Sequence, residues 1–526
     1  MQSLAVSFCY QVLFKSCSNL NSTLSQKGKG DDGDEASSMY DTLRSQLLRL
    51  CTKDGTPEQA RNSVQALSSL VNPASQPVSD LTSRVRKEKK EFEPLLKALV
   101  APSRLAIPND SVNPKHKTRI VSILSAIAAI AECAPYAFNS SGGEGSTHCW
   151  GERALEFALN SVLLEKDTSS NPSQEEDNST SGSESDDESP VKSSRKSIGR
   201  GSKNAASSTK EISLHCQMMC AAMEVVVAHI RSTIVRIKTD GTHSELRPPS
   251  NAHLTEVFNT LIKFVQDAGR LSSSGNKSHC KTDHDQAELR RCAATNILRL
   301  CDANLQLEQK YLSPKMWHIL STALLDREIS VRESVMEELS CMLTGSGKFR
   351  HNSSSYPPSL RFVALVALCA DGDGTRSVAN GKAANVGRRS TSIKIAATQC
   401  IKSLRTTCQA TQAQCRSLGK EAEKNFENRL KMKLMPEYCV PYALHLLSFR
   451  HETASAGGTV AAEDSSDDEN LVNDALISSE AASQKMLKKR LKWIFDPLVQ
   501  SLGAGADNVR FFYQRYVIHV LFSNEF

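Results

Sequence analysis

The sequence predicts an all-α fold in which pairs of helices stack into a solenoid, interrupted by long disordered insertions. Apolar residues recur at helical spacing along much of the chain, and one such pattern occurs three times, its first two copies about forty residues apart. The composition agrees, because 39% of the 526 residues are hydrophobic and only 5% are aromatic. Stacked helices with cores of Ala, Leu, Ile and Val have this composition.

The clearest helical pair is predicted in Ser313–Leu343, where two apolar stripes are separated by a short break. The stripes consist of Trp317, Leu320, Leu324 and Leu325, then Val331, Val335, Met336, Leu339 and Met342. Ser313 followed by Pro314 is a favourable helix start, and Asp326 is expected to cap the second helix. Because one pair cannot bury both stripes, we expect further pairs to stack on either side.

The second stripe has two counterparts in the sequence. The three copies are Leu289, Arg290, Ala293, Ile297; Val331, Arg332, Val335, Leu339; and Ile393, Lys394, Ala397, Ile401. A base follows the first apolar residue each time, and the period of the first two copies is that of HEAT-type repeats. Chance alignment of amphipathic helices is the alternative. We expect Arg332 near the seam between repeats, reaching an acid or a carbonyl of the adjoining repeat.

Changes in composition predict the domain boundaries. We expect an N-terminal helix and polar linker at 1–54, followed by HEAT-like repeats at 55–166 and at 211–450, the latter with a Gly-rich loop at 371–392. A Ser-rich insertion at 167–210, acidic and then basic, separates the two sets of repeats. An acidic insertion at 451–484 and truncated C-terminal repeat helices at 485–526 follow. Both insertions are predicted to be disordered, because their low hydrophobicity cannot offset the conformational entropy lost on ordering.

Candidate phosphorylation sites lie in the two insertions. Ser183, Ser185, Ser465 and Ser466 have the acidic context that an acid-directed kinase recognises, and Ser189 precedes a proline. Loops rich in Ser, Asp and Glu also produce such matches by chance. The basic end of the first insertion, 192–203, is a candidate nuclear-import signal.

A basic run near the C-terminus is a candidate interaction ridge. It consists of Lys485, Lys488, Lys489, Arg490 and Lys492. The apolar residues that follow, Trp493 to Val499, are expected to face the preceding repeat and leave most of the bases in solvent. The ridge could contact DNA phosphates or an acidic protein segment, could be masked by the acidic insertion, or could be an ordinary solvated surface. A second run at 84–93 contains three glutamates, which favours a solvated surface there.

The sequence contains no recognisable catalytic or cofactor-binding motif, so neither an enzyme nor a cofactor is expected. His279, Cys280 and His284 lack a second cysteine pair, which argues against zinc. The 16 cysteines are scattered through apolar stretches, as reduced core thiols are. No stretch is expected to span a membrane, and the net charge of +6 does not by itself indicate nucleic-acid binding.

Five sequence blocks together resemble the C-terminal half of the HEAT-repeat array in the precocious-dissociation-of-sisters family of cohesin regulators. These blocks are Glu91–Leu105, Ile127–Phe138, Ser313–Leu339, Leu360–Asp373 and Lys433–Glu452. The resemblance implies a nuclear, chromatin-associated scaffold that binds cohesin through its kleisin subunit and cooperates with the releasing factor Wapl. It implies no individual partner-binding residue. The alternative is a generic HEAT adaptor, such as a nuclear-transport or phosphatase scaffold.

Overall fold

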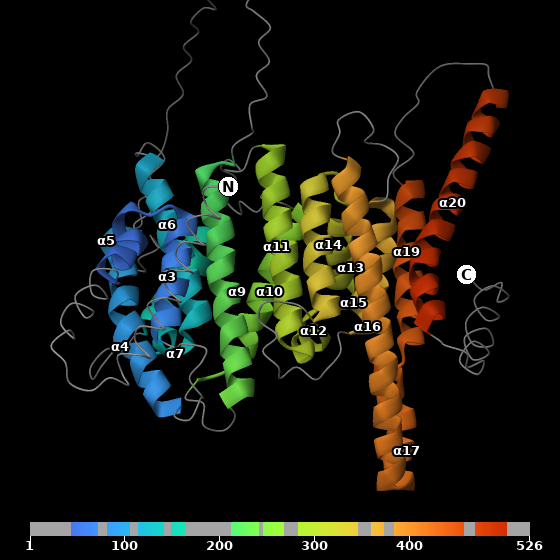
Figure 1. Ribbon diagram of the computed structural model, residues 1–526. Helices are drawn as coiled ribbons and strands as arrows, with labels where there is room; N and C mark the ends of the chain where they lie inside the picture. The colour runs from blue at the N-terminus through green and yellow to red at the C-terminus, as the bar shows by residue number, and fades with distance from the viewer. Residues whose placement is uncertain are drawn as a thin grey trace, which may run out of the picture.

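The computed structural model describes residues 44–71, 81–105, 114–140, 149–164, 212–240, 246–267, 282–345, 359–372, 383–456 and 469–501, and within these ranges it is helical without strands (Figure 1). This confirms the all-α prediction. The predicted insertion at 167–210, the helix expected before residue 44, and all five candidate phosphoserines lie outside the described residues.

The helices form a stacked array with one continuous layer, in which each helix packs against the next along the chain. This layer comprises α3 (Pro57–Val71), α6 (Pro114–Cys133), α9 (Leu214–Asp240), α11 (Asp283–Ala303), α14 (Ile329–Thr344), α16 (Ala383–Leu418) and α20 (Glu469–Ser501). The helices that pair with it are α4 (Leu81–Leu99), α7 (Pro135–Phe138), α8 (Trp150–Glu156), α10 (Asn251–Asp267), α12 (Leu305–Tyr311), α13 (Pro314–Thr322), α15 (Leu360–Leu365) and α19 (Cys439–Ala456).

Short elements connect or extend these helices. The remaining α-helices are α5 (Pro102–Leu105), α17 (Lys420–Asn425) and α18 (Lys431–Leu434). Turns of 3-10 helix occur at η4 (Ala323–Leu325), η5 (Val366–Gly372) and η8 (Pro436–Tyr438), and π-helical turns at η1 (Leu50–Asp54), η2 (Phe157–Leu163) and η7 (Phe426–Leu430).

The helix ends of the central pair follow from local side-chain chemistry. Ser313 caps α13, because its hydroxyl accepts a hydrogen bond from the Met316 amide at 3.3 Å. Gly345 ends α14 in the left-handed conformation (φ 68°), which glycine adopts without steric cost. Asp326 is not the N-cap of α14; its carboxylate accepts from the amide of Glu328, the N-cap residue, at 2.9 Å, and so orders the turn before the helix.

The three repeated stripes are buried as predicted. All nine of their apolar residues are at most 1% exposed: Leu289, Ala293, Ile297, Val331, Val335, Leu339, Ile393, Ala397 and Ile401. They contribute to one core that runs through the stacked pairs. The spacing of three to four residues therefore identified the packed face of α11, α14 and α16.

Three boundary expectations differ from the structure. Helix α16 begins at Ala383, inside the predicted Gly-rich loop, while α19 continues to Ala456 and α20 begins at Glu469, both inside the predicted acidic insertion. A helix once started adds each residue at little cost, so a packed segment extends into neighbouring polar sequence that composition alone assigns to a loop.

Helix α9 also corrects the expectation that no stretch could span a membrane. It is 27 residues long and apolar enough to do so, but 78% of its most apolar window is buried inside the array. Helices α6 and α11 pack against it on either side. Its apolar composition therefore serves the protein core.

Candidate interaction surfaces

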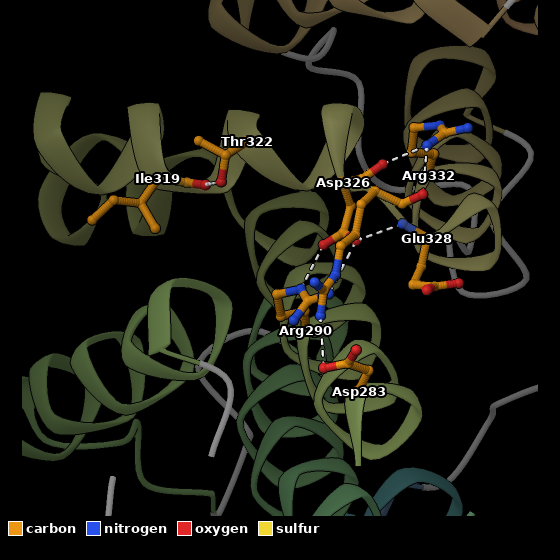
Figure 2. Close-up of polar contacts among 8 residues, drawn as sticks. Asp283, Arg290, Ile319, Thr322, Asp326, Glu328 and Arg332 are labelled. Carbon is orange, nitrogen blue, oxygen red and sulfur yellow. Dashed lines mark hydrogen bonds and ion pairs between the residues drawn. The ribbon is translucent and has the colours of Figure 1, made fainter. Parts of the chain in front are cut away.

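The repeats are joined by an ion pair between α11 and the turn that precedes α14 (Figure 2). The guanidinium of Arg290 donates to both carboxylate oxygens of Asp326, at 2.5 and 3.1 Å. The two side chains are only 14% and 6% exposed. A two-pronged contact of this kind fixes orientation as well as distance, so it holds neighbouring repeats in register.

Arg332, the equivalent base in the next copy, stays within its own repeat. It donates to the backbone carbonyls of Asp326 and Arg327 in the turn before α14 (Figure 2). The prediction that it reaches an adjoining repeat was wrong, because a side chain in the first helical turn points back toward the N-terminus of its helix. Arg332 therefore stabilises the turn before α14, and Asp326 in this turn binds Arg290.

Two further pairs strengthen the same junction. Arg327 contacts Asp283 at 2.9 Å, and Arg299 of α11 contacts Glu338 of α14 at 3.0 Å. Three of the contacts at this seam are therefore ion pairs that connect α11 to the following repeat. At the seam between α11 and α14, these charged side chains form ion pairs between elements in addition to their contact with solvent.

The third copy repeats the arrangement at the seam between α16 and α20. The ammonium of Lys394 on α16 lies 2.9 Å from the carboxylate of Asp496 on α20 and 5.9 Å from the centre of the Trp493 ring. A base at this position of the repeat thus again binds an acid of a following element. The sequence repeat identified both bases, but their partners are distant in the chain.

A buried pair at the end of the array was not predicted. Arg405 of α16 donates to Glu437 of η8 at 2.6 Å and to the Ser501 hydroxyl at 3.2 Å, and both charged residues are buried. Glu437 belongs to the Met-Pro-Glu-Tyr segment of the fifth resembling block. The pair connects α16, η8 and α20, and no local spacing in the sequence indicates it.

Four of the five bases of the predicted ridge, the lysines, lie on one side of α20, whereas Arg490 is half-buried and lies on the side of Ile494. Lys485, Lys488 and Lys492 are exposed and Lys489 is half-buried. Ile494 and Leu498 are buried on the opposite side, and Trp493 is buried at the boundary between the two sides, so the helix is oriented as its polar and apolar residues require. Val499 corrects the expectation that every apolar residue of the run faces the preceding repeat, because it is 63% exposed. It stands seven residues after Lys492, two turns along the same face.

The charge around this face is unbalanced. Helix α16, which packs against α20, contains no acidic residue in its 36 residues. Asp496 is the only acid of α20 after Lys485, and Lys394 binds it. In α4, by contrast, Glu88 lies near Arg84 and Glu91 binds Arg44 at 2.7 Å, so acids are interspersed among its bases.

Two buried groups inside the N-terminal repeats have shifted pKa values. Burial lowers the pKa of His229 to about 3, with a smaller contribution from His253, and the ring packs on Phe138 with centroids 5.1 Å apart. Burial raises the pKa of Glu132, although Arg231 and Arg61 oppose this shift. Each shift follows from packing inside the array.

The cysteines and the candidate metal ligands form neither a disulfide nor a metal site among the described residues. The cysteines that the structure describes are free thiols, and Cys51, Cys216, Cys301 and Cys400 are buried. His284 lies at the start of α11, while His279 and Cys280 lie outside the described residues. Among the described residues no cluster of His, Cys, Asp and Glu could hold a metal ion.

Stacked helical pairs, a repeated buried stripe and bases that bind the next element define a HEAT-repeat protein. The chain matches the family described as sister chromatid cohesion protein PDS5 over residues 11–514, and it belongs to that family. No curated protein sequence matches it. The chain therefore has a role in sister chromatid cohesion, and its family regulates cohesin without enzymatic activity. Membership also associates it with cohesin and with chromatin in the nucleus.

Proposed function

We propose that the protein is a scaffold that binds cohesin through its kleisin subunit and, together with the releasing factor Wapl, regulates how long cohesin is retained on chromatin. The family match over residues 11–514 carries this proposal. Such a role requires surfaces that bind other proteins and requires no catalytic group.

The packing of the array supports a scaffold role. Arg61 on α3 binds Glu224 on α9 at 2.8 Å, and Arg299 on α11 binds Glu338 on α14 at 3.0 Å. The first pair connects two helices that flank α6, and the second connects successive helices, so both fix relative positions within one layer. An extended peptide binds with less entropic cost to a surface that is already ordered, so a fixed array suits partners that bind as extended segments.

Affinity purification tests the proposal. The tagged protein is purified from dividing cells after nuclease treatment, so that association bridged by DNA is removed, and bound proteins are identified by mass spectrometry. We expect cohesin subunits, the kleisin among them, and Wapl. Recovery of transport GTPase or phosphatase subunits without cohesin would select a generic HEAT adaptor instead.

A second measurement tests regulation directly. Fluorescence recovery after photobleaching reports the residence time of tagged cohesin on chromatin. We expect the residence time to change when the protein is depleted and to return when it is restored. An unchanged residence time, in cells where depletion is complete, would contradict a regulatory role.

A further inference from the structure

We propose that the outward face of α20 binds the phosphate backbone of duplex DNA. This face, called here the lysine face, consists of Lys485, Lys488, Lys489 and Lys492. Three of these side chains are exposed and the fourth is half-buried. The proposal concerns DNA contact and does not depend on the binding of cohesin subunits.

Helix geometry places the four lysines in one row. Their spacing of three, four and seven residues confines them to one side of the helix, opposite the buried Ile494 and Leu498, while the buried Trp493 lies at the edge of that side. At a rise of 1.5 Å per residue the row is about 10 Å long. Phosphates of one DNA strand recur about every 3.4 Å along the duplex axis, so such a row is long enough to follow about three of them.

Residues 485–501 of α20 and the adjoining α16 carry an excess of positive charge. The segment from Lys485 to Phe495 contains no acid, and the adjoining α16 has none in 36 residues. Asp496 is bound by Lys394 at 2.9 Å. In α16 and in residues 485–501 of α20, positive charge therefore dominates, and such a surface attracts a polyanion.

DNA fits the face better than an acidic protein segment. Binding of a protein segment depends on a few apolar or aromatic side chains that insert between the partners. Of the aromatic residues here, Trp493 is buried and Phe495 packs against the core. Two apolar residues are exposed nearby: Met486, 39% exposed, lies to the side of the lysine row, and Val499, 63% exposed, lies two turns beyond its last lysine. Contact with DNA phosphates requires only positive charges at suitable spacing, because the release of counterions favours binding.

The test compares two triple charge reversals. The α20 variant carries Lys488→Glu, Lys489→Glu and Lys492→Glu. The control carries Arg86→Glu, Lys87→Glu and Lys90→Glu on α4, where the three bases are also exposed. Both variants change the net charge equally, so a difference between them reports the position of the charge. Fluorescence anisotropy measures binding to a labelled duplex of arbitrary sequence over a series of salt concentrations.

We expect the parent to bind with an affinity that falls as salt rises. The α20 variant should bind DNA at least about tenfold more weakly than the parent. The slope of its plot of log affinity against log salt should decrease in magnitude by about one for each lysine removed. The control should retain most of the parent's affinity. Circular dichroism should show equal helix content, and Lys→Gln changes at the three α20 positions provide a milder series should the reversal unfold the helix.

Three outcomes would overturn the proposal. The first is that the parent does not bind duplex DNA. The second is that the α20 variant and the α4 control lose DNA affinity equally. The third is that the α20 variant binds DNA normally but no longer binds polyglutamate, which serves as a model acidic peptide. The last outcome would assign the face to an acidic protein partner. Cohesin subunits should co-purify with the α20 variant after nuclease treatment, which separates this test from that of the proposed function.

Discussion

The seam between α11 and α14 and the outward face of α20 both carry several charged residues, but they use them differently. At the seam, Arg290 binds Asp326, and Arg299 binds Glu338. On α20, Lys488 and Lys492 are exposed beside a helix without acids. The repeat position of a base, and the acids around it, therefore decide whether its charge stabilises the array or remains available to a partner.

Energetics explain why the two kinds of position differ. A buried ion pair that loses one partner leaves an uncompensated charge, which costs several kcal/mol. An exposed lysine interacts mainly with water and salt, so its replacement changes stability little. The seam and the lysine face should therefore respond in opposite ways to substitution.

The largest effect is expected from the core that both regions share. Leu339→Ala should lower the free energy of unfolding by about 2 to 5 kcal/mol, because Leu339 is fully buried and its truncation leaves a cavity. Glu337→Ala, an exposed position on the same helix, is the matched control and should change it by less than about 0.5 kcal/mol. Chemical denaturation followed by circular dichroism measures both, and equal losses would show that α14 is not packed as described.

Substitution at the seam between α11 and α14 should cause the next largest loss in the free energy of unfolding. Arg290→Ala should cost about 2 to 4 kcal/mol, since it leaves the carboxylate of Asp326, only 6% exposed, without its main partner. Arg327→Ala is the control, because its pair with Asp283 is 61% and 73% exposed and such pairs contribute about 0 to 1 kcal/mol. If both substitutions lowered the unfolding midpoint equally, the distinction between buried and exposed pairs at the seam would be lost.

Acidification should reveal an effect in the N-terminal repeats that grows as the pH falls. His229 has a pKa of about 3 in the fold against an ordinary value of 6.5. The unfolded chain therefore takes up a proton at a higher pH than the folded chain, and stability falls as the pH falls from 6.5 toward 3. His229→Phe preserves ring packing on Phe138, so its thermal midpoint should decline less over this range; parallel curves would contradict the prediction.

The smallest effect on stability is expected at the lysine face. Reversal of Lys488, Lys489 and Lys492 should change the unfolding free energy by no more than about 0.5 kcal/mol per residue, because Lys and Glu form helices almost equally well. Thermal unfolding of the parent and the variant should nearly coincide. A large loss of stability would mean that these lysines hold α20 on the array.

The sequence predicted the fold where periodicity determines burial. The stripe of Val331, Val335 and Leu339 and the Ser313 cap both follow from local spacing, and both are confirmed. The start of α20 at Glu469 was missed, because its polar first half resembles a loop in composition. Val499 differs from the expectation because it lies on the side of α20 that carries Lys492, where no described helix covers it to more than a small extent.

The interaction surfaces were only partly predictable. The basic run of α20 is visible in the sequence, since its residues are close together in the chain. The partners of Arg290, Lys394 and Arg405 lie 36, 102 and 32 residues away, so only the folded arrangement brings them together. Whether a base is held or available is therefore a property of the fold.

Two variants, each measured for stability and for DNA affinity, test whether the base at the seam stabilises the array while the bases of the lysine face bind DNA. Arg290→Ala and the triple reversal at Lys488, Lys489 and Lys492 are each assayed for unfolding and for DNA affinity. We predict that Arg290→Ala unfolds at a lower denaturant concentration but binds DNA nearly as the parent does, whereas the triple reversal unfolds as the parent does but loses DNA affinity and its salt dependence. Equal effects of the two variants on both properties would contradict the separation of structural from available charge.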